Sequence, residues 1–134
     1  MHLTVEAKIQ NVELVTDFVN ARLDELGCPR RAKTQIDIAL DELFSNICHY
    51  AYLSGRGDAT IRVEKAPDQN AVNITLEDCG VPFNPLAHDD PDISLGIHDR
   101  EIGGLGIFMV KKTMDDIRYE YRDGRNMLTV VKRL

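Results

Sequence analysis

The sequence lacks the features that commonly mark membrane, secreted and nucleic-acid-binding proteins. Its longest apolar runs are only a few residues, whereas a helix needs ~20 to span a bilayer. Its first residues do not place a basic segment before an apolar one, as a signal peptide does. The formal net charge is −6, and no long run of lysine or arginine occurs, which argues against nucleic acid as the main partner. We therefore expect neither membrane attachment nor direct binding of nucleic acid.

Cysteine is also scarce. The three cysteines, Cys28, Cys48 and Cys79, are odd in number and scattered along the chain. A disulfide framework uses paired cysteines, and a zinc site needs them closely spaced. Reduced thiols in a cytoplasmic protein fit this pattern best.

The sequence predicts one compact domain. A chain of 134 residues suits a single core, and no internal repeat, low-complexity tract or second domain is visible. Alternating apolar and polar residues predict strands at 2–6, 60–64, 72–77, 117–122 and 127–131. Helical spacing predicts helices over 10–26 and 30–52, and a third that begins at the glycines of 103–106. Gly27 is expected to end the first helix, and Asp123 and Gly124 to form a hairpin turn before the last strand.

The helix predicted over 30–52 carries a polar cluster beside its apolar stripe. The stripe consists of Ile36, Ala39, Leu40, Leu43, Ile47 and Ala51. Glu42, Asn46 and His49 share a second direction, about 120° around the helix. A carboxylate, an amide and an imidazole could therefore meet a ligand on a rigid element. The same spacing also fits a solvated helix face whose polar residues are there by chance.

Asp78 follows the strand at 72–77 and shares the side of Val72, Ile74 and Leu76. It should therefore point toward the covered face of the sheet, where a carboxylate needs a hydrogen-bonding partner. The alternative is that Asp78 merely opens a turn with Gly80.

Residues 79–103 show no sustained period and contain three prolines. A connection this long inside a compact domain is usually a functional lid or a disordered segment. It ends at Gly103, Gly104, Leu105 and Gly106, where the third helix is expected to begin. Glycines just before a helix let backbone amides approach a phosphate at the positive end of the helix dipole. A flexible hinge is the alternative.

In order and spacing, these three features match one known pattern. The sequence resembles the ATP-binding domain shared by type II topoisomerases, heat-shock chaperones and sensor histidine kinases, the GHKL superfamily. Residues 42–46 resemble its N box, 78–80 its first glycine box and 104–106 its second. The resemblance implies an α+β fold: a Bergerat-type two-layer sandwich, with a mixed, mostly antiparallel sheet covered on one face by about three helices. It also implies a single domain over 1–134, with an ATP lid at about 84–103.

Within that superfamily, the sequence is most similar to the small bacterial anti-sigma factor serine/threonine kinases. The similarity lies in residues 41–43, in 78–85 with the sequence DCGVPFNP, and in 103–107. Sensor histidine kinases usually carry asparagine where this chain has Glu42. Pro82 stands where many superfamily members have a second glycine, which is typical of the anti-sigma kinases. Asn84 often matches an aspartate in them, a minor departure.

The resemblance implies a site for ATP and Mg²⁺. Asn46 would coordinate Mg²⁺ through its amide oxygen, Glu42 would act as general base on an attacking hydroxyl or water, and Asp78 would accept a hydrogen bond from the adenine amino group. The other residues implied to contact the nucleotide are His49, Gly80, Pro82, Phe83, Gly103, Gly104, Leu105, Gly106 and Thr129. For two of these an alternative is equally open. The His could pack on Tyr52 instead, and the Thr could be an ordinary strand residue.

The implied function is an ATP-dependent serine/threonine-protein kinase. It would phosphorylate a STAS-type anti-anti-sigma protein and sequester a sigma factor in a partner switch, and it could form a homodimer. The alternative is a nucleotide-dependent binding adaptor that transfers no phosphate. Retention of both Glu42 and Asn46 favours the kinase. A severed histidine-kinase catalytic domain is less favoured, because the chain has no room for a dimerising helical hairpin that carries a phosphoacceptor histidine.

Overall fold

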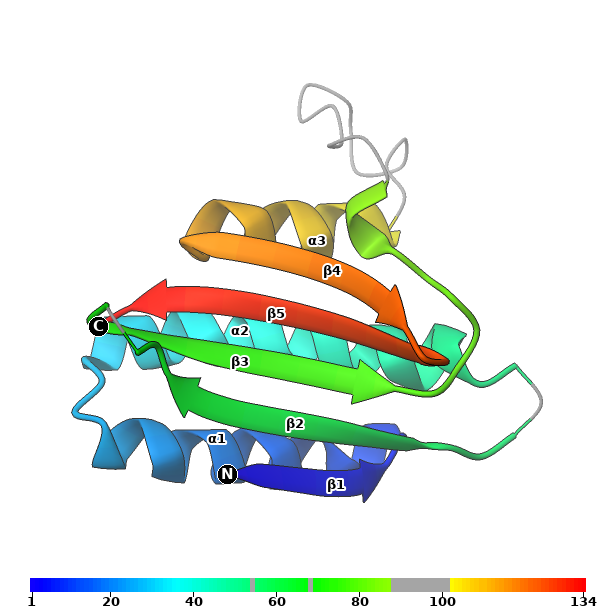
Figure 1. The fold of residues 1–134 in the computed structure, drawn as a ribbon, viewed down its shortest axis with the longest axis horizontal. Coiled ribbons are helices and arrows are strands. Elements are labelled where there is room, and N and C mark those ends of the chain that lie inside the picture. The colour runs from blue at the N-terminus through cyan, green and yellow to red at the C-terminus, as the bar shows by residue number, and fades with distance from the viewer. Residues whose placement is uncertain (54, 68, 88–101) are drawn as a thin grey trace.

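The computed structural model describes residues 1–53, 55–67, 69–87 and 102–134, of which 102–105 are described by their backbone alone. Its centre is a five-stranded sheet with the order β1-β2-β3-β5-β4 (Figure 1). The strands are β1 (His2–Glu6), β2 (Asp58–Lys65), β3 (Ala71–Asp78), β4 (Asp116–Arg122) and β5 (Arg125–Arg133). All four strand pairings are antiparallel, so this part of the chain shows no parallel component of the mixed sheet that was expected.

The helices of the described part cover one face of this sheet, and the other face is open (Figure 1). They are α1 (Val12–Glu25), α2 (Arg30–Asn46) and α3 (Ile102–Thr113). The 3₁₀ turns η1 (Ile9–Asn11) and η3 (Pro85–Ala87) are short connections. A π-helical turn, η2 (Ile47–Ala51), continues α2. The expected α+β two-layer sandwich is confirmed.

The core lies between the two layers and follows the predicted periodicities. In β2 and β3 every second side chain faces the helices, and α2 contributes its predicted apolar stripe together with the fully buried Phe44. The buried residues of β2 and β3 that show this alternation are Ala59, Ile61, Val63, Val72, Ile74 and Leu76. This alternation fixes which strand residues can reach a site beside α2 and which point to the open face.

Two turns form where the sequence places residues that tolerate positive φ. Gly27, at φ 71°, ends α1, and the amides of Gly27 and Cys28 bond back to Asp24 O and Leu23 O at 3.1 and 3.0 Å. Asp123 and Gly124, at φ 54° and 77°, close the β4–β5 hairpin. Both turns agree with the sequence-based predictions.

The third helix begins earlier than predicted. It starts at Ile102, so the glycines at 103, 104 and 106 lie within its first turns rather than before it. The expected lid over 84–103 falls mostly on 88–101, which lies outside the described residues. The lid and the single-domain assignment therefore stay predictions. Within the described ranges, no helix is both long enough and apolar enough to cross a membrane.

Candidate functional site

A pocket opens between the C-terminal half of α2 and the helix-facing side of the sheet. Its empty volume, counted with its open mouth, is about 430 Å³. The walls are mainly apolar and come from α2, η2, β3, β4, β5 and the segment after β3. The polar side chains that line it are Asn46, Asp78, Tyr119 and Asn126. An apolar pocket with a few convergent polar groups is the usual form of a small-molecule site.

Asp78 ends β3 and points into this pocket, as its strand parity predicted. Only 7% of its surface is exposed. Its Oδ1 accepts hydrogen bonds from the Gly80 N–H and from Asn126 Nδ2, each at 2.9 Å. Burial raises the pKa of Asp78, and these two hydrogen bonds oppose the rise. Asp78 thus points to the covered face of the sheet, as predicted, and also forms the turn with Gly80 that was given as the alternative.

The second oxygen of this carboxyl group, Oδ2, forms no hydrogen bond with the described part of the chain. It is therefore the atom of Asp78 that can accept a hydrogen bond from a ligand.

Gly80 allows the chain after β3 to pack against the end of η2. A Cβ at this position would collide with the carbonyl group of Ala51, and the next amide, Val81 N–H, donates to Ala51 O at 2.9 Å. The absence of a side chain at Gly80 therefore serves a backbone-to-backbone contact. This contact does not test its predicted closeness to an adenine base.

Glu42 and Asn46 lie one turn apart on α2, beside the pocket. Asn46 lines it directly. Glu42 Oε1 is buried and accepts no hydrogen bond from the described residues. The carboxylate packs against Gly106 of α3 so closely that any Cβ there would collide with it. The first turns of α3 and the middle of α2 therefore meet at the Glu42 carboxylate.

The environment of Glu42 suits a proton acceptor. Burial raises its pKa, the Asn46 side chain opposes the rise, and the negative charge of Asp41 adds to it. A carboxyl group works best as a general base when its pKa lies nearer the working pH. A buried acceptor without a partner also costs stability, and such costs often mark functional sites.

His49 does not reach the pocket. It is exposed, and its ring meets the neighbouring Tyr50 edge-on, with centroids 6.1 Å apart. Tyr52 is engaged elsewhere, because its hydroxyl donates to Asp58 O at 2.6 Å and accepts from the Cys79 N–H at 2.9 Å. The predicted contact of His49 with the nucleotide stays a prediction. The π-helical turn departs from the α-helical spacing that grouped His49 with Glu42.

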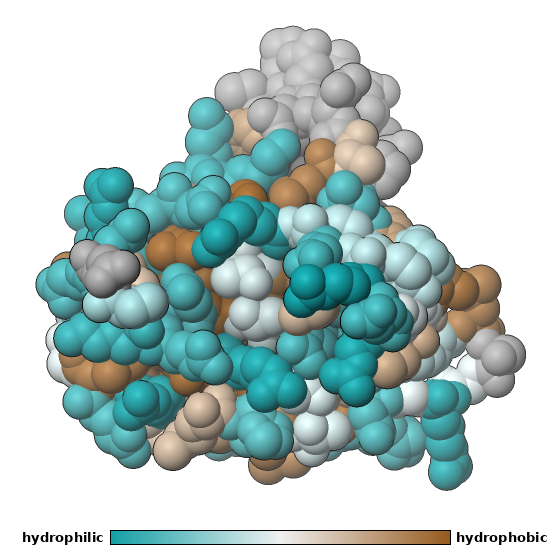
Figure 2. Space-filling view, viewed as in Figure 1, coloured by the Kyte–Doolittle hydropathy of each residue, from teal (hydrophilic) through white to brown (hydrophobic). Residues whose placement is uncertain are grey.

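Thr129 also lies away from the pocket, and its assignment to the adenine is corrected. Its hydroxyl is 2.9 Å from that of Thr75 on the neighbouring strand. Since Leu128 and Val130 are buried against the helices, strand alternation directs Thr129 to the open face. That face is mainly hydrophilic (Figure 2).

The remaining predicted residues divide into three groups. Phe83 lines the pocket and stacks on Tyr50, with ring centroids 5.5 Å apart. Pro82 is exposed and does not line it. Gly103, Gly104 and Leu105 belong to the start of α3, and no side-chain placement is described for them.

Two pocket residues, Asn126 and Tyr119, were not among the site residues predicted from the sequence. Asn126 pairs with Asp78 across β3 and β5 and is only 5% exposed. Tyr119 donates its hydroxyl hydrogen to Asn126 Oδ1. The alternation of the strand at 117–122 gave one indication for Tyr119, which it places on the side of Ile117. It gave none for Asn126, because the last strand was predicted to begin at residue 127.

The family model of the histidine kinase-like ATPase domain matches residues 5–132. The chain belongs to this family. The match covers the helices and the strands except the start of β1 and the last residue of β5. The predicted family resemblance is confirmed.

Curated relatives of this histidine kinase-like ATPase domain are named as protein kinases. Serine/threonine-protein kinase BtrW of Bordetella bronchiseptica is 26% identical over 100 residues, which cover 75% of this chain and 70% of the relative. Serine-protein kinase RsbW of Listeria monocytogenes is 25% identical over 126 residues, 91% of this chain and 80% of the relative. Serine-protein kinase RsbW of Bacillus mycoides is 24% identical over 132 residues, which cover 96% of this chain and 81% of the relative.

Proposed function

We propose that this chain is an ATP-dependent serine/threonine-protein kinase that uses the pocket between α2 and the sheet. The observation that carries the proposal is the arrangement around this one pocket. Asp78 and Asn46 line it, and Glu42, one turn before Asn46 on α2, has a buried oxygen, Oε1, that accepts no hydrogen bond from the described residues. Kinase chemistry needs a nucleotide contact, a metal ligand and a proton acceptor, and these three side chains can supply them.

The purine end fits an adenine base. Asp78 Oδ2 is available as an acceptor for an amino group, while Oδ1 is held by the protein. The walls beside it are the apolar side chains of Leu76, Leu128 and Phe83, which suit the faces of a planar ring.

The phosphate end fits a magnesium-bound triphosphate. Asn46 offers an amide oxygen, a ligand type that Mg²⁺ accepts alongside phosphates and water. The glycine-rich start of α3 can bring backbone amides close to phosphate oxygens at the positive end of the helix. When bound, MgATP supplies the phosphoryl group that is transferred. Glu42 would accept the proton of the attacking serine or threonine hydroxyl, in keeping with its raised pKa.

The partners of the kinase belong to the same proposal. Its substrate would be a STAS-type anti-anti-sigma protein. The chain would also sequester a sigma factor, acting as a cytoplasmic switch that can form a homodimer. Support comes from the motifs at 41–43, 78–85 and 103–107 and from relatives that are named serine-protein kinases. Nucleotide state would bias which partner is held, through a difference in affinity between the two states.

The test is a capture experiment with the purified chain as bait. Extract of the source cell is passed over it with MgATP and then with MgADP, and captured proteins are searched for phosphoserine or phosphothreonine by mass spectrometry. The captured substrate is then labelled by the wild type, by Glu42→Gln and by the control Glu13→Gln, which changes an exposed residue of α1. We expect Glu42→Gln to keep nucleotide binding but lose transfer, because the positioned base is gone.

Two other outcomes would change the conclusion. Normal labelling by Glu42→Gln would refute the base assignment. Nucleotide-dependent capture of a partner that the wild type never phosphorylates would replace the kinase by the adaptor.

A further inference from the structure

The side-chain amide of Asn126 uses all of its hydrogen-bonding capacity inside the protein. Nδ2 donates to Asp78 Oδ1 at 2.9 Å and to Val81 O at 2.8 Å. Oδ1 accepts from the Phe83 N–H at 3.1 Å and from the Tyr119 hydroxyl. A primary amide has two hydrogens to donate and two lone pairs. Asn126 therefore has nothing left for a ligand, although it lines the pocket.

The orientation of this amide is dictated by two backbone groups. The Phe83 N–H can only donate, so it must face the oxygen of Asn126. The Val81 carbonyl can only accept, so it must face the nitrogen. Asp78 is consequently presented with an N–H donor, because the reversed amide would set its oxygen against the Val81 carbonyl and its NH₂ group against the Phe83 N–H.

This donor determines what Asp78 can offer to a ligand. Oδ1 already accepts from Gly80 and Asn126, so a proton on this carboxyl group would have to sit on Oδ2. Ionised Asp78 offers Oδ2 as an acceptor, which suits the amino group at C6 of adenine. Protonated Asp78 offers an O–H donor instead, which suits the keto group of a 6-keto purine.

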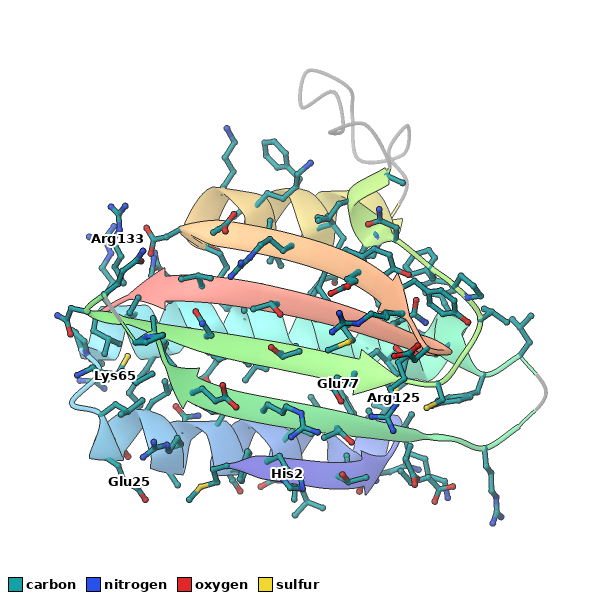
Figure 3. The ribbon with its side chains drawn as sticks, in the orientation of Figure 1. His2, Glu25, Lys65, Glu77, Arg125 and Arg133 are labelled. Carbon is teal, nitrogen blue, oxygen red and sulfur yellow. The ribbon has the colours of Figure 1, made fainter. Side chains whose placement is uncertain are left out.

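The neighbouring carboxylate shows how the two faces of the sheet differ. Glu77 points to the open face, where Arg62 lies 3.0 Å and Arg125 3.6 Å from its oxygens (Figure 3). Glu77 is therefore paired with arginines, whereas the described donors to Asp78 are the neutral Gly80 N–H and Asn126 amide. Burial raises the pKa of Asp78, and the hydrogen bond from Asn126 is the larger of the two opposing effects.

We propose that Asn126 is a positioning residue that keeps Asp78 a hydrogen-bond acceptor and so makes the pocket prefer 6-amino over 6-keto purines. The inference rests on the proposed function, because it takes Asp78 as the contact to the base. Asn126 acts only through Asp78 and through the Val81–Phe83 segment that the same amide holds.

The test compares two substitutions of almost equal shape, Asn126→Val and Asn126→Thr. Both side chains suit a strand, but only the threonine retains a group that can donate to Asp78. ATP and inosine triphosphate, whose base carries a keto group at C6, are titrated calorimetrically against each protein between about pH 5 and pH 8. The measured quantities are the ratio of the two dissociation constants and the midpoint of its pH dependence. Thr129→Val is the control, since it removes a hydroxyl from the same strand on the open face.

For the wild type we expect a preference for ATP. In Asn126→Val the preference should fall about tenfold or more near pH 7, and its midpoint should move up by about one to two pH units. Asn126→Thr should stay closer to the wild type, and Thr129→Val should match it. A substitution that only loosened the fold would lower the affinities for ATP and for inosine triphosphate alike and would leave the midpoint of the pH dependence unchanged. If Asn126→Val does not fold, Asn126→Ala and Asn126→Ser repeat the comparison with smaller side chains.

The failures of the two proposals are distinguishable. If the wild type binds neither nucleotide, the proposed function falls, and this inference falls with it. If the wild type prefers ATP and Asn126→Val keeps the same ratio and midpoint, this inference alone is overturned.

Discussion

Replacing Asp78 by asparagine tests the purine end of the pocket while leaving its framework in place. The asparagine Oδ1 can accept the same two hydrogen bonds, from the Gly80 N–H and from Asn126 Nδ2. The substitution exchanges Oδ2, an acceptor, for an NH₂ group, which can only donate. The amino group of an adenine base would then face a donor.

The expected loss follows from the strength of one hydrogen bond. A bond to a charged group contributes about 1.5–3 kcal/mol, and about 1.4 kcal/mol corresponds to tenfold in affinity. Asp78→Asn should therefore weaken binding of MgATP by about 10- to 150-fold in a calorimetric titration. Asp17→Asn, at an exposed position of α1, should bind as the wild type does. An affinity unchanged by Asp78→Asn would refute the adenine contact.

The same variant also makes a prediction about pH. Because burial raises the pKa of Asp78 above its ordinary 3.8, the folded state holds this proton more tightly than the unfolded state does. The resulting stability is fully present below the ordinary pKa and is lost as pH rises through the folded-state pKa. Asp78→Asn has no such proton, so its stability relative to the wild type should increase as pH rises through this window. Urea unfolding at several pH values measures the difference, and a constant or decreasing difference would contradict it.

Two glycines give further predictions. Gly106→Ala adds a Cβ that displaces the Glu42 carboxylate, and because this carboxylate ends a flexible side chain, we expect the protein to fold. The rate of phosphoryl transfer should fall at least about tenfold. An unaltered rate would rule out a role of this contact in positioning Glu42. In a Glu42→Ala background the same change should raise the free energy of unfolding by about 0.5–1 kcal/mol, the usual preference of a helix for alanine over glycine. Gly80→Ala collides with the backbone carbonyl of Ala51 and should cost about 1–3 kcal/mol, measured as a lower urea midpoint; an equal midpoint would show that this contact is loose.

The sequence predicted those parts of the fold that local periodicity encodes. The apolar stripe of α2 and the inward side of β3 were correct because burial repeats every three to four residues in a helix and every two in a strand. The parity of β3 alone directed Asp78 toward the covered face. Gly27 and the Asp123–Gly124 pair marked turns because they tolerate positive φ.

Features that depend on distant contacts could not be read from the pattern. Asn126 owes its role to Asp78, Val81 and Phe83, which lie 48, 45 and 43 residues away along the chain. Gly106 packs against a carboxylate on another helix, although its sequence context pointed only to phosphate binding. Thr129 was different, since the burial of alternate residues in its own strand would have placed it on the open face.

The distribution of unpaired acceptors connects the fold to the proposed chemistry. At the purine end the described donors converge on Asp78 Oδ1 and leave Oδ2 unbonded. On α2, Glu42 Oε1 is buried and accepts no hydrogen bond from the described residues. Native proteins pair most buried polar atoms, and an unpaired acceptor costs about 1–3 kcal/mol. A ligand that brings an amino group to Asp78, and a substrate hydroxyl that brings a proton to Glu42, would satisfy both atoms. If the proposed function holds, the reaction would remove the cost that the unpaired Glu42 Oε1 carries in the free protein.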